Sequence, residues 1–187
     1  GRKMAKIHVP YSKDGMDLNI EDKNLLKVLT SKAHDFKPEK SESQLVEDSM
    51  DNPIGSKKLE ELAIGKKNIV IITSDHTRPV PSKVTMPIIL RRIRSVNKEA
   101  KIKILIANGF HRPTTKEELI FKMGEEIVEN EEIVMHISTD DSQMVKAGVL
   151  PSGGDFYLNK VAFEADLLIA EGFIEPHFFA GFSAAMP

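Results

Sequence analysis

The sequence contains no cysteine. This absence excludes disulfide bonds, thiolate metal sites and a cysteine nucleophile, so any metal would have to be held by histidines, by carboxylates or by a cofactor. A chain without cysteine is typical of the reducing cytoplasm, and we expect a cytoplasmic protein.

The sequence also has no excess of charge of one sign and no long apolar run. Its 26 Lys and Arg residues nearly balance 28 Asp and Glu residues, which leaves no net field to hold a nucleic acid or an anionic membrane surface. The apolar runs at 69–73 and 166–170 are far shorter than the roughly 20 residues needed to cross a bilayer, and we expect no signal peptide. We therefore expect a soluble protein whose partners include neither nucleic acid nor membrane.

The 187 residues suffice for one well-buried domain, and the pattern of apolar residues indicates its class. Apolar, β-branched runs at 68–73, 101–107, 133–137 and 166–170 alternate with amphipathic segments at 84–96 and 116–129. This rhythm predicts an α/β fold with a mostly parallel, Rossmann-like sheet and helices on both faces. We expect Pro87 in the first turn of the first helix and a break at Gly124 in the second.

The part of the chain before this pattern predicts smaller elements. Residues 7–11 and a run through 18–20 flank a turn at 13–15, which predicts an N-terminal hairpin. Apolar spacing predicts helices at 22–29, 43–50 and 57–64, the last closed by Gly65. The region 148–155 is the clearest turn later in the chain.

Polar segments follow three of the predicted strands directly. In open parallel sheets the ligand crevice lies outside the carboxyl ends of the strands, so these segments are the candidates for a site. They are Ser74-Asp75-His76-Thr77-Arg78-Pro79, Asn108-Gly109-Phe110-His111-Arg112-Pro113, and Glu171-Gly172-Phe173-Ile174-Glu175-Pro176-His177.

Each segment alone has an ordinary structural explanation. Asp75 and Thr77 suit a helix cap, and His111 suits a solvated loop beside a capping Thr114. Together, however, the segments bring two histidines and an Asp/Arg pair to one edge of the sheet. The other histidines lack a second ligand at metal spacing, and Gly153-Gly154-Asp155 lacks the pattern of a phosphate loop, so the residues themselves predict no metal site.

The three segments, taken in order and with their spacing, resemble the lactate racemase family, the nickel-pincer-dependent 2-hydroxy acid racemases. The resemblance runs from about residue 7 to residue 183. Its specific parts are Asp75-His76-Thr77-Arg78-Pro79, Gly109-Phe110-His111-Arg112-Pro113, and Glu175-Pro176-His177-Phe178-Phe179-Ala180-Gly181-Phe182-Ser183.

The resemblance implies the N-terminal half of a two-domain cytoplasmic enzyme with its active site between the domains. The implied cofactor is the nickel-pincer nucleotide, pyridinium-3,5-bisthiocarboxylate mononucleotide with nickel, derived from nicotinic acid mononucleotide. The implied partners are lactate or a related 2-hydroxy acid, the C-terminal domain and the proteins that synthesise the cofactor. His111 and His177 match the acid/base histidines, and Asp75, His76, Thr77 and Arg78 match the cofactor-contacting segment. Arg78 also suits the substrate carboxylate.

Two histidines suit this chemistry. The α-hydrogen of lactate is poorly acidic beside an ionised carboxylate, so it leaves more readily as hydride while a base takes the hydroxyl proton. Return of hydride to the other face of the planar keto acid places the hydroxyl on the opposite side, where a second acid/base group is needed. The two histidines would exchange roles between the enantiomers.

The sequence departs from the family pattern after Ser183. The family has two glycines and then the lysine that attaches the cofactor, whereas this sequence reads Ala184-Ala185-Met186-Pro187, with no lysine after His177. The family's nickel-ligating histidine and C-terminal substrate residues are also absent. We expect residues 1–187 to be the N-terminal α/β catalytic domain of a longer chain, without the C-terminal domain, and to hold no metal and be inactive alone.

A second interpretation stays open. The chain would then be a non-catalytic domain that binds a small carboxylate or nucleotide through Asp75, Arg78 and the nearby helix N-termini, which attract anions. A hydrolase built on paired histidines is weaker, because no nucleophile or metal set accompanies them.

Overall fold

The computed structural model describes residues 3–184, and the chain divides into two compact units between Glu39 and Lys40. The first unit holds an antiparallel hairpin of β1 (Met4–Val9) and β2 (Met16–Glu21), in which Val9 pairs with Met16. Gly15 adopts a φ of +73° in the turn, a conformation that favours glycine. The predicted N-terminal hairpin is confirmed.

The predicted helix at 22–29 is wrong. Only η1 (Asp22–Asn24) forms a 3-10 turn, and Leu25 is already extended; a second 3-10 turn, η2 (Lys32–Asp35), follows. Leu26 and Leu29 are exposed. A short helix depends on packing of its apolar face, and these leucines find no core in their unit.

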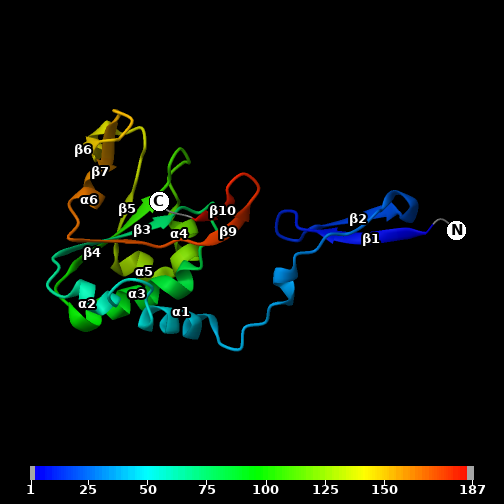
Figure 1. Cartoon of the computed structure of the whole chain (residues 1–187), viewed down its shortest axis with the longest axis horizontal. Coiled ribbons are helices and arrows are strands. Elements are labelled where there is room, and N and C mark those ends of the chain that lie inside the picture. Colours follow the sequence, from blue (N-terminus) through cyan, green and yellow to red (C-terminus); the bar gives the residue numbers. More distant parts are fainter. Residues whose placement is uncertain (1–2, 185–187) are drawn as a thin grey trace. The chain divides into compact units, whose positions relative to one another are not determined.

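The second unit is built on a four-stranded parallel sheet in the order β5-β4-β3-β8 (Figure 1). Its strands are β3 (Asn68–Ser74), β4 (Lys101–Ala107), β5 (Glu132–Met135) and β8 (Leu167–Ala170). Ile71 of β3 pairs with Ile104 on one side and Ile169 on the other. The parallel α/β sheet predicted from the apolar runs is confirmed, and the carboxyl ends of its strands share one edge.

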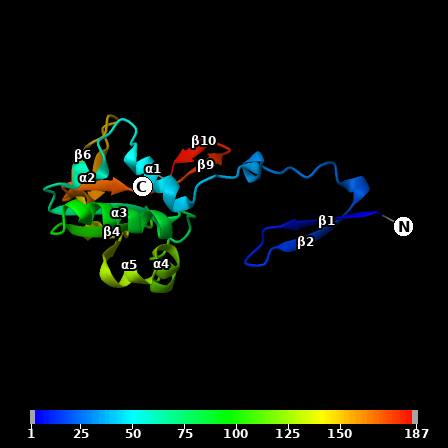
Figure 2. The same cartoon turned by 90° about the horizontal axis from the view of Figure 1, so that it is seen from below.

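The helices of this unit largely follow the prediction. They are α1 (Glu42–Asp51), α2 (Leu59–Ala63), α3 (Ser82–Val96), α4 (Lys116–Met123), α5 (Glu125–Asn130) and α6 (Lys160–Phe163). In Figure 2, α3 runs between α1 and α2 on one side and α4 and α5 on the other. The predicted break at Gly124 is confirmed, with a φ of +94°. No helix within residues 3–184 has the length and apolar character of a membrane span.

The position of Pro87 differs from the prediction. Because α3 already begins at Ser82, Pro87 lies beyond its first turn, where it removes a backbone hydrogen bond. The proline is exposed, while Met86, Ile89 and Ile93 pack against the sheet. Burial of this apolar face sustains the helix across the proline.

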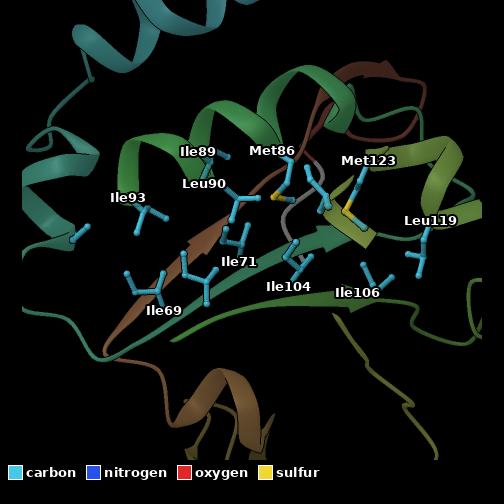
Figure 3. Packing of buried hydrophobic residues seen from close by; sticks show 13 residues of the cluster. Ile69, Ile71, Met86, Ile89, Leu90, Ile93, Ile104, Ile106, Leu119 and Met123 are labelled. Carbon is cyan, nitrogen blue, oxygen red and sulfur yellow. The ribbon is translucent and has the colours of Figure 1, made fainter. Parts of the chain in front are cut away.

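The main core lies on the sheet face that α1 to α5 cover (Figure 3). There Ile69, Ile71, Ile104 and Ile106 meet the apolar side of α3 and the residues Leu119 and Met123 of α4. The alternate residues of the same strands face the other side, where Ala162 of α6 contributes to a smaller cluster. Helices thus lie on both faces of the sheet, with α1 to α5 on one face and α6 on the other.

Two antiparallel hairpins and one 3-10 turn complete this unit. The elements are η3 (Asp141–Gln143), the pair β6 (Met144–Val149) and β7 (Asp155–Asn159), and the pair β9 (Ile174–His177) and β10 (Gly181–Ala184). The turn predicted at 148–155 joins β6 to β7.

Candidate active site

The site is organised around Asp75, which follows β3 and is only 2% exposed. One carboxylate oxygen accepts hydrogen bonds from the Thr77 amide (3.0 Å) and the Thr77 hydroxyl (2.6 Å). The other accepts a hydrogen bond of 2.7 Å from Nδ1 of His111. Burial alone would raise the pKa of Asp75, but the bonds from Thr77 and His111 and the charge of His111 outweigh it and hold the pKa below its ordinary value.

His111 lies in the loop after β4, the neighbour of β3 in the sheet. Its amide donates to the Asn108 carbonyl at 2.9 Å, and its side chain is half exposed. Because Nδ1 donates to the carboxylate of Asp75, the neutral ring has its bare nitrogen, Nε2, free for a ligand. An oriented histidine of this kind suits a general base.

His76 supports the loop that carries His111. Its Nδ1 contacts the Thr114 hydroxyl at 3.0 Å, and this hydroxyl also accepts a bond of 3.1 Å from the side-chain Nδ2 of Asn108. Glu118 lies 3.7 Å from the same ring nitrogen. The bidentate pair with Arg112, together with the Thr115 amide, lowers the pKa of Glu118 to about 2.

A pocket of about 660 Å³ opens beside these residues, between the loop 76–81, the start of α3 and α4. Arg78 lines it with an exposed guanidinium that has no hydrogen-bond or ion-pair partner among the described residues. Lys83 also lines it, with its ammonium 5.2 Å from the centre of the Phe121 ring. Arg78 and Lys83 can pair with an anion in this pocket, which Glu117 and Glu118 also line.

His177 ends β9, at the base of the β9–β10 turn. Its Nδ1 accepts hydrogen bonds of 3.1 Å from the amides of Phe179 and Ala180, and its ring stacks on Phe178. Within residues 3–184, no hydrogen bond or ion pair joins His177 to His111 or Asp75. The structure thus brings Asp75, Thr77 and His111 into contact and leaves His177 on a separate hairpin.

Sequence reasoning assigned no role to two buried charged residues next to this site, Glu171 and Lys122. Glu171 follows β8 directly, so its place after a strand was a usable signal. Lys122 lies in the middle of α4, where nothing in the pattern distinguishes it from a surface lysine. No group of three or more metal-ligating side chains gathers in the described part of the chain. Pro187, where the resemblance to the family leads us to expect a lysine, lies outside the described residues.

The chain matches one protein family over nearly its whole length. The family is described as the lactate racemase N-terminal domain, and the match covers residues 11–186. The lactate racemase of Lactiplantibacillus plantarum is 64% identical over 180 residues, which are 96% of this chain and 42% of that protein. The lactate racemase of Thermoanaerobacterium thermosaccharolyticum is 56% identical over the same share of each chain.

A solved structure agrees with these similarities. The lactate racemase apoprotein from Thermoanaerobacterium thermosaccharolyticum superposes with a TM-score of 0.81 at 54% identity, covering 96% of this chain and 41% of that one. The chain thus spans about two fifths of the length of the relatives it matches. The parallel sheet, the residues at its carboxyl edge and these similarities agree: the chain belongs to the lactate racemase N-terminal domain family.

Proposed function

We propose that this chain is the N-terminal catalytic half of a cytoplasmic enzyme that interconverts L- and D-lactate, or the enantiomers of a related 2-hydroxy acid. The observation that carries the proposal is the pair of buried Asp75 and half-exposed His111 at the carboxyl edge of the sheet. Relatives named lactate racemase that are 56% and 64% identical support it. The activity would belong to the whole protein, with the C-terminal domain as a partner.

We propose the nickel-pincer nucleotide as cofactor, and the size and basic side chains of the pocket support this proposal. A volume of about 660 Å³ is in the range of small-molecule sites, and Arg78 and Lys83 suit a phosphate or carboxylate. The segment Asp75 to Arg78 would hold the cofactor, whose synthesis requires further proteins. When bound, the cofactor supplies an electrophilic ring that takes up hydride from the substrate carbon.

His111 would take the hydroxyl proton of the substrate at Nε2. The ring then becomes positively charged, and Asp75, bonded to Nδ1 at 2.7 Å, stabilises that charge. The same bond keeps the ring from rotating, so Nε2 points in a fixed direction. Arg78, free of other partners in the described chain, would pair with the substrate carboxylate and orient the hydroxyl.

The hydrogen bonds of His177 favour a different protonation of its ring from that of His111. Because its Nδ1 accepts two backbone amides, a neutral His177 carries its proton on Nε2 and donates a hydrogen bond there. For His177 to act as the base with the opposite enantiomer, Nδ1 must carry the proton instead, which requires the turn at 178–180 to release it. The two histidines would therefore take part in one reaction although, in their neutral forms, they carry the proton on different ring nitrogens.

The test uses the full-length, cofactor-loaded enzyme with a chiral assay of lactate. His111→Gln and His177→Gln should each lower turnover by about 10²-fold or more, because each removes an acid/base group. His8→Gln is the matched control: His8 is also paired with a carboxylate, Asp17, at 2.7 Å, but on the exposed N-terminal hairpin. Turnover that survives in both site variants would refute the proposal.

Binding without catalysis is a second candidate function, and the basic pocket favours it. Calorimetry on the full-length protein would separate the two functions. Affinity for nicotinic acid mononucleotide, lactate or pyruvate without turnover in the loaded protein would support the binding domain, whereas no affinity for any of them would exclude it.

A further inference from the structure

We infer that Glu171 is a positioning residue that anchors the His177 hairpin to the loop carrying Asp75 and to the start of α3. The inference rests on the proposed racemase function for its catalytic consequence, whereas the anchoring itself can be measured without cofactor. Glu171 makes no contact with a reacting group; it would act through the segments that it joins.

Glu171 is 5% exposed and bonded to β3 through its backbone and its side chain. Its amide donates to the Ile72 carbonyl at 2.8 Å, which extends the pairing of β8 with β3 by one residue. Its carboxylate accepts a bond of 2.6 Å from the Thr73 hydroxyl. Thr73 lies two residues before Asp75, so Glu171 is fixed to the strand that carries the central carboxylate of the site.

The same carboxylate binds two side-chain hydroxyls in the first turn of α3. This helix has no side-chain cap of its own, because Pro81 occupies the N-cap position. Glu171 accepts a bond of 2.8 Å from the Ser82 hydroxyl and a further bond from Thr85, both in the first turn of the helix. A negative charge at this end also interacts favourably with the helix dipole. The loop 76–81 is thereby held at both ends by residues bonded to Glu171.

Lys122 supplies a buried positive charge that interacts with Glu171 and Asp75. It is 8% exposed, and its ammonium has no hydrogen-bond partner within residues 3–184. Burial lowers the pKa of Lys122, while the negative charges of Glu171 and Asp75 oppose that change. Lys122 belongs to α4, the helix that follows the His111 loop, so its positive charge acts on both buried carboxylates from the part of the chain that carries His111.

Glu171 is the residue through which the chain is hydrogen-bonded to β3 just before it enters the β9–β10 hairpin. Only Gly172 and Phe173 separate it from β9, which ends at His177. The hairpin itself exposes Phe178, Phe179 and Phe182, so its own packing within the described chain is slight. The direction in which β9 leaves the sheet therefore depends on how firmly Glu171 is held.

The test compares Glu171→Gln with Asn97→Ala in the full-length protein. Asn97 is the matched control: it is also partly buried and tied to the backbone, but at the opposite end of α3, where it bonds the Ala63 and Lys66 carbonyls. In the protein without cofactor, Glu171→Gln should accelerate hydrogen exchange of the amides at 172–177 about tenfold or more, because an amide cannot accept from all three hydroxyls. Asn97→Ala should leave exchange at 172–177 unchanged.

Turnover of the loaded enzyme gives the second measurement. Per bound nickel, Glu171→Gln should lower kcat about tenfold or more, because the hairpin that carries His177 loses its anchor. KM for lactate should rise as well, because the loop that carries Arg78 is held by the same carboxylate. A merely structural role would lower the nickel content but leave kcat per nickel unchanged. Thr85→Val, which removes one donor, should show the same pattern more weakly and carries the test if Glu171→Gln does not fold.

The outcomes separate the two hypotheses. Unchanged exchange at 172–177 in folded Glu171→Gln would overturn the anchoring role, and unchanged kcat per nickel would overturn its catalytic consequence. Faster exchange in the variant, with no racemisation by the loaded wild-type protein, would support the anchor and refute the proposed function.

Discussion

Replacement of Asp75 by asparagine tests the central contact of the site. Asp75 accepts from three donors: the amide and hydroxyl of Thr77 and Nδ1 of His111. Asparagine has one acceptor oxygen, so its NH₂ group must face either the Thr77 donors or His111. Loss of a buried, charge-assisted hydrogen bond costs about 1–3 kcal/mol, and we expect the free energy of unfolding to fall by that amount.

The effect of Asp75→Asn on turnover should be larger than its effect on stability. If oxygen keeps the Thr77 donors, the NH₂ group faces Nδ1 of His111, which must then accept, and the proton moves to Nε2. His111 would no longer offer a bare Nε2 to the substrate hydroxyl, so we expect turnover to fall by roughly 10²-fold or more.

The assay is racemisation of lactate by the loaded full-length enzyme, together with urea unfolding of the same variants. Asp17→Asn is the control, because Asp17 binds the Nδ1 of His8 at the same distance of 2.7 Å on an exposed hairpin. It should leave turnover unchanged. Wild-type turnover in Asp75→Asn would show that the carboxylate does not set the proton position on His111, and would refute the reasoning.

Three further predictions concern stability. Ile104→Ala removes a fully buried side chain of the central strands and should lower the free energy of unfolding by about 2–5 kcal/mol, measured by urea titration. Arg112 lowers the pKa of Glu118, so the pair contributes to the free energy of unfolding above about pH 4.5, and this contribution is lost as the pH falls toward 2. In Glu118→Gln the free energy of unfolding should therefore depend less on pH in that window. A pH dependence equal to that of the wild-type protein would contradict the pairing. Arg92 is buried and bonded to Glu47 of α1, so Arg92→Leu should accelerate hydrogen exchange at 42–51 and leave exchange in β4 unchanged.

The sequence sufficed for what depends on local pattern. Apolar runs defined β3, β4, β5 and β8, and the segments that follow three of them contain every predicted site residue. The pattern did not predict β9, the hairpin strand in which His177 lies. Strand ends are predictable because parallel strands place their carboxyl ends at one edge. Where a local pattern competes with packing, prediction failed: the leucines at 22–29 found no core to form a helix against, and α3 continued past Pro87 because its apolar face is buried.

Tertiary structure alone decided which polar groups meet. Asp75 reaches His111 across 36 positions of sequence because β3 and β4 are neighbours in the sheet. Glu171 reaches Thr73 across 98 positions because β8 pairs with β3 on the other side. The order of the strands depends on how the whole set of helices and strands buries its apolar surface, and no single segment specifies that order. The proton position on His111 and the anchor of the His177 hairpin therefore depend on contacts that cannot be read from the sequence pattern.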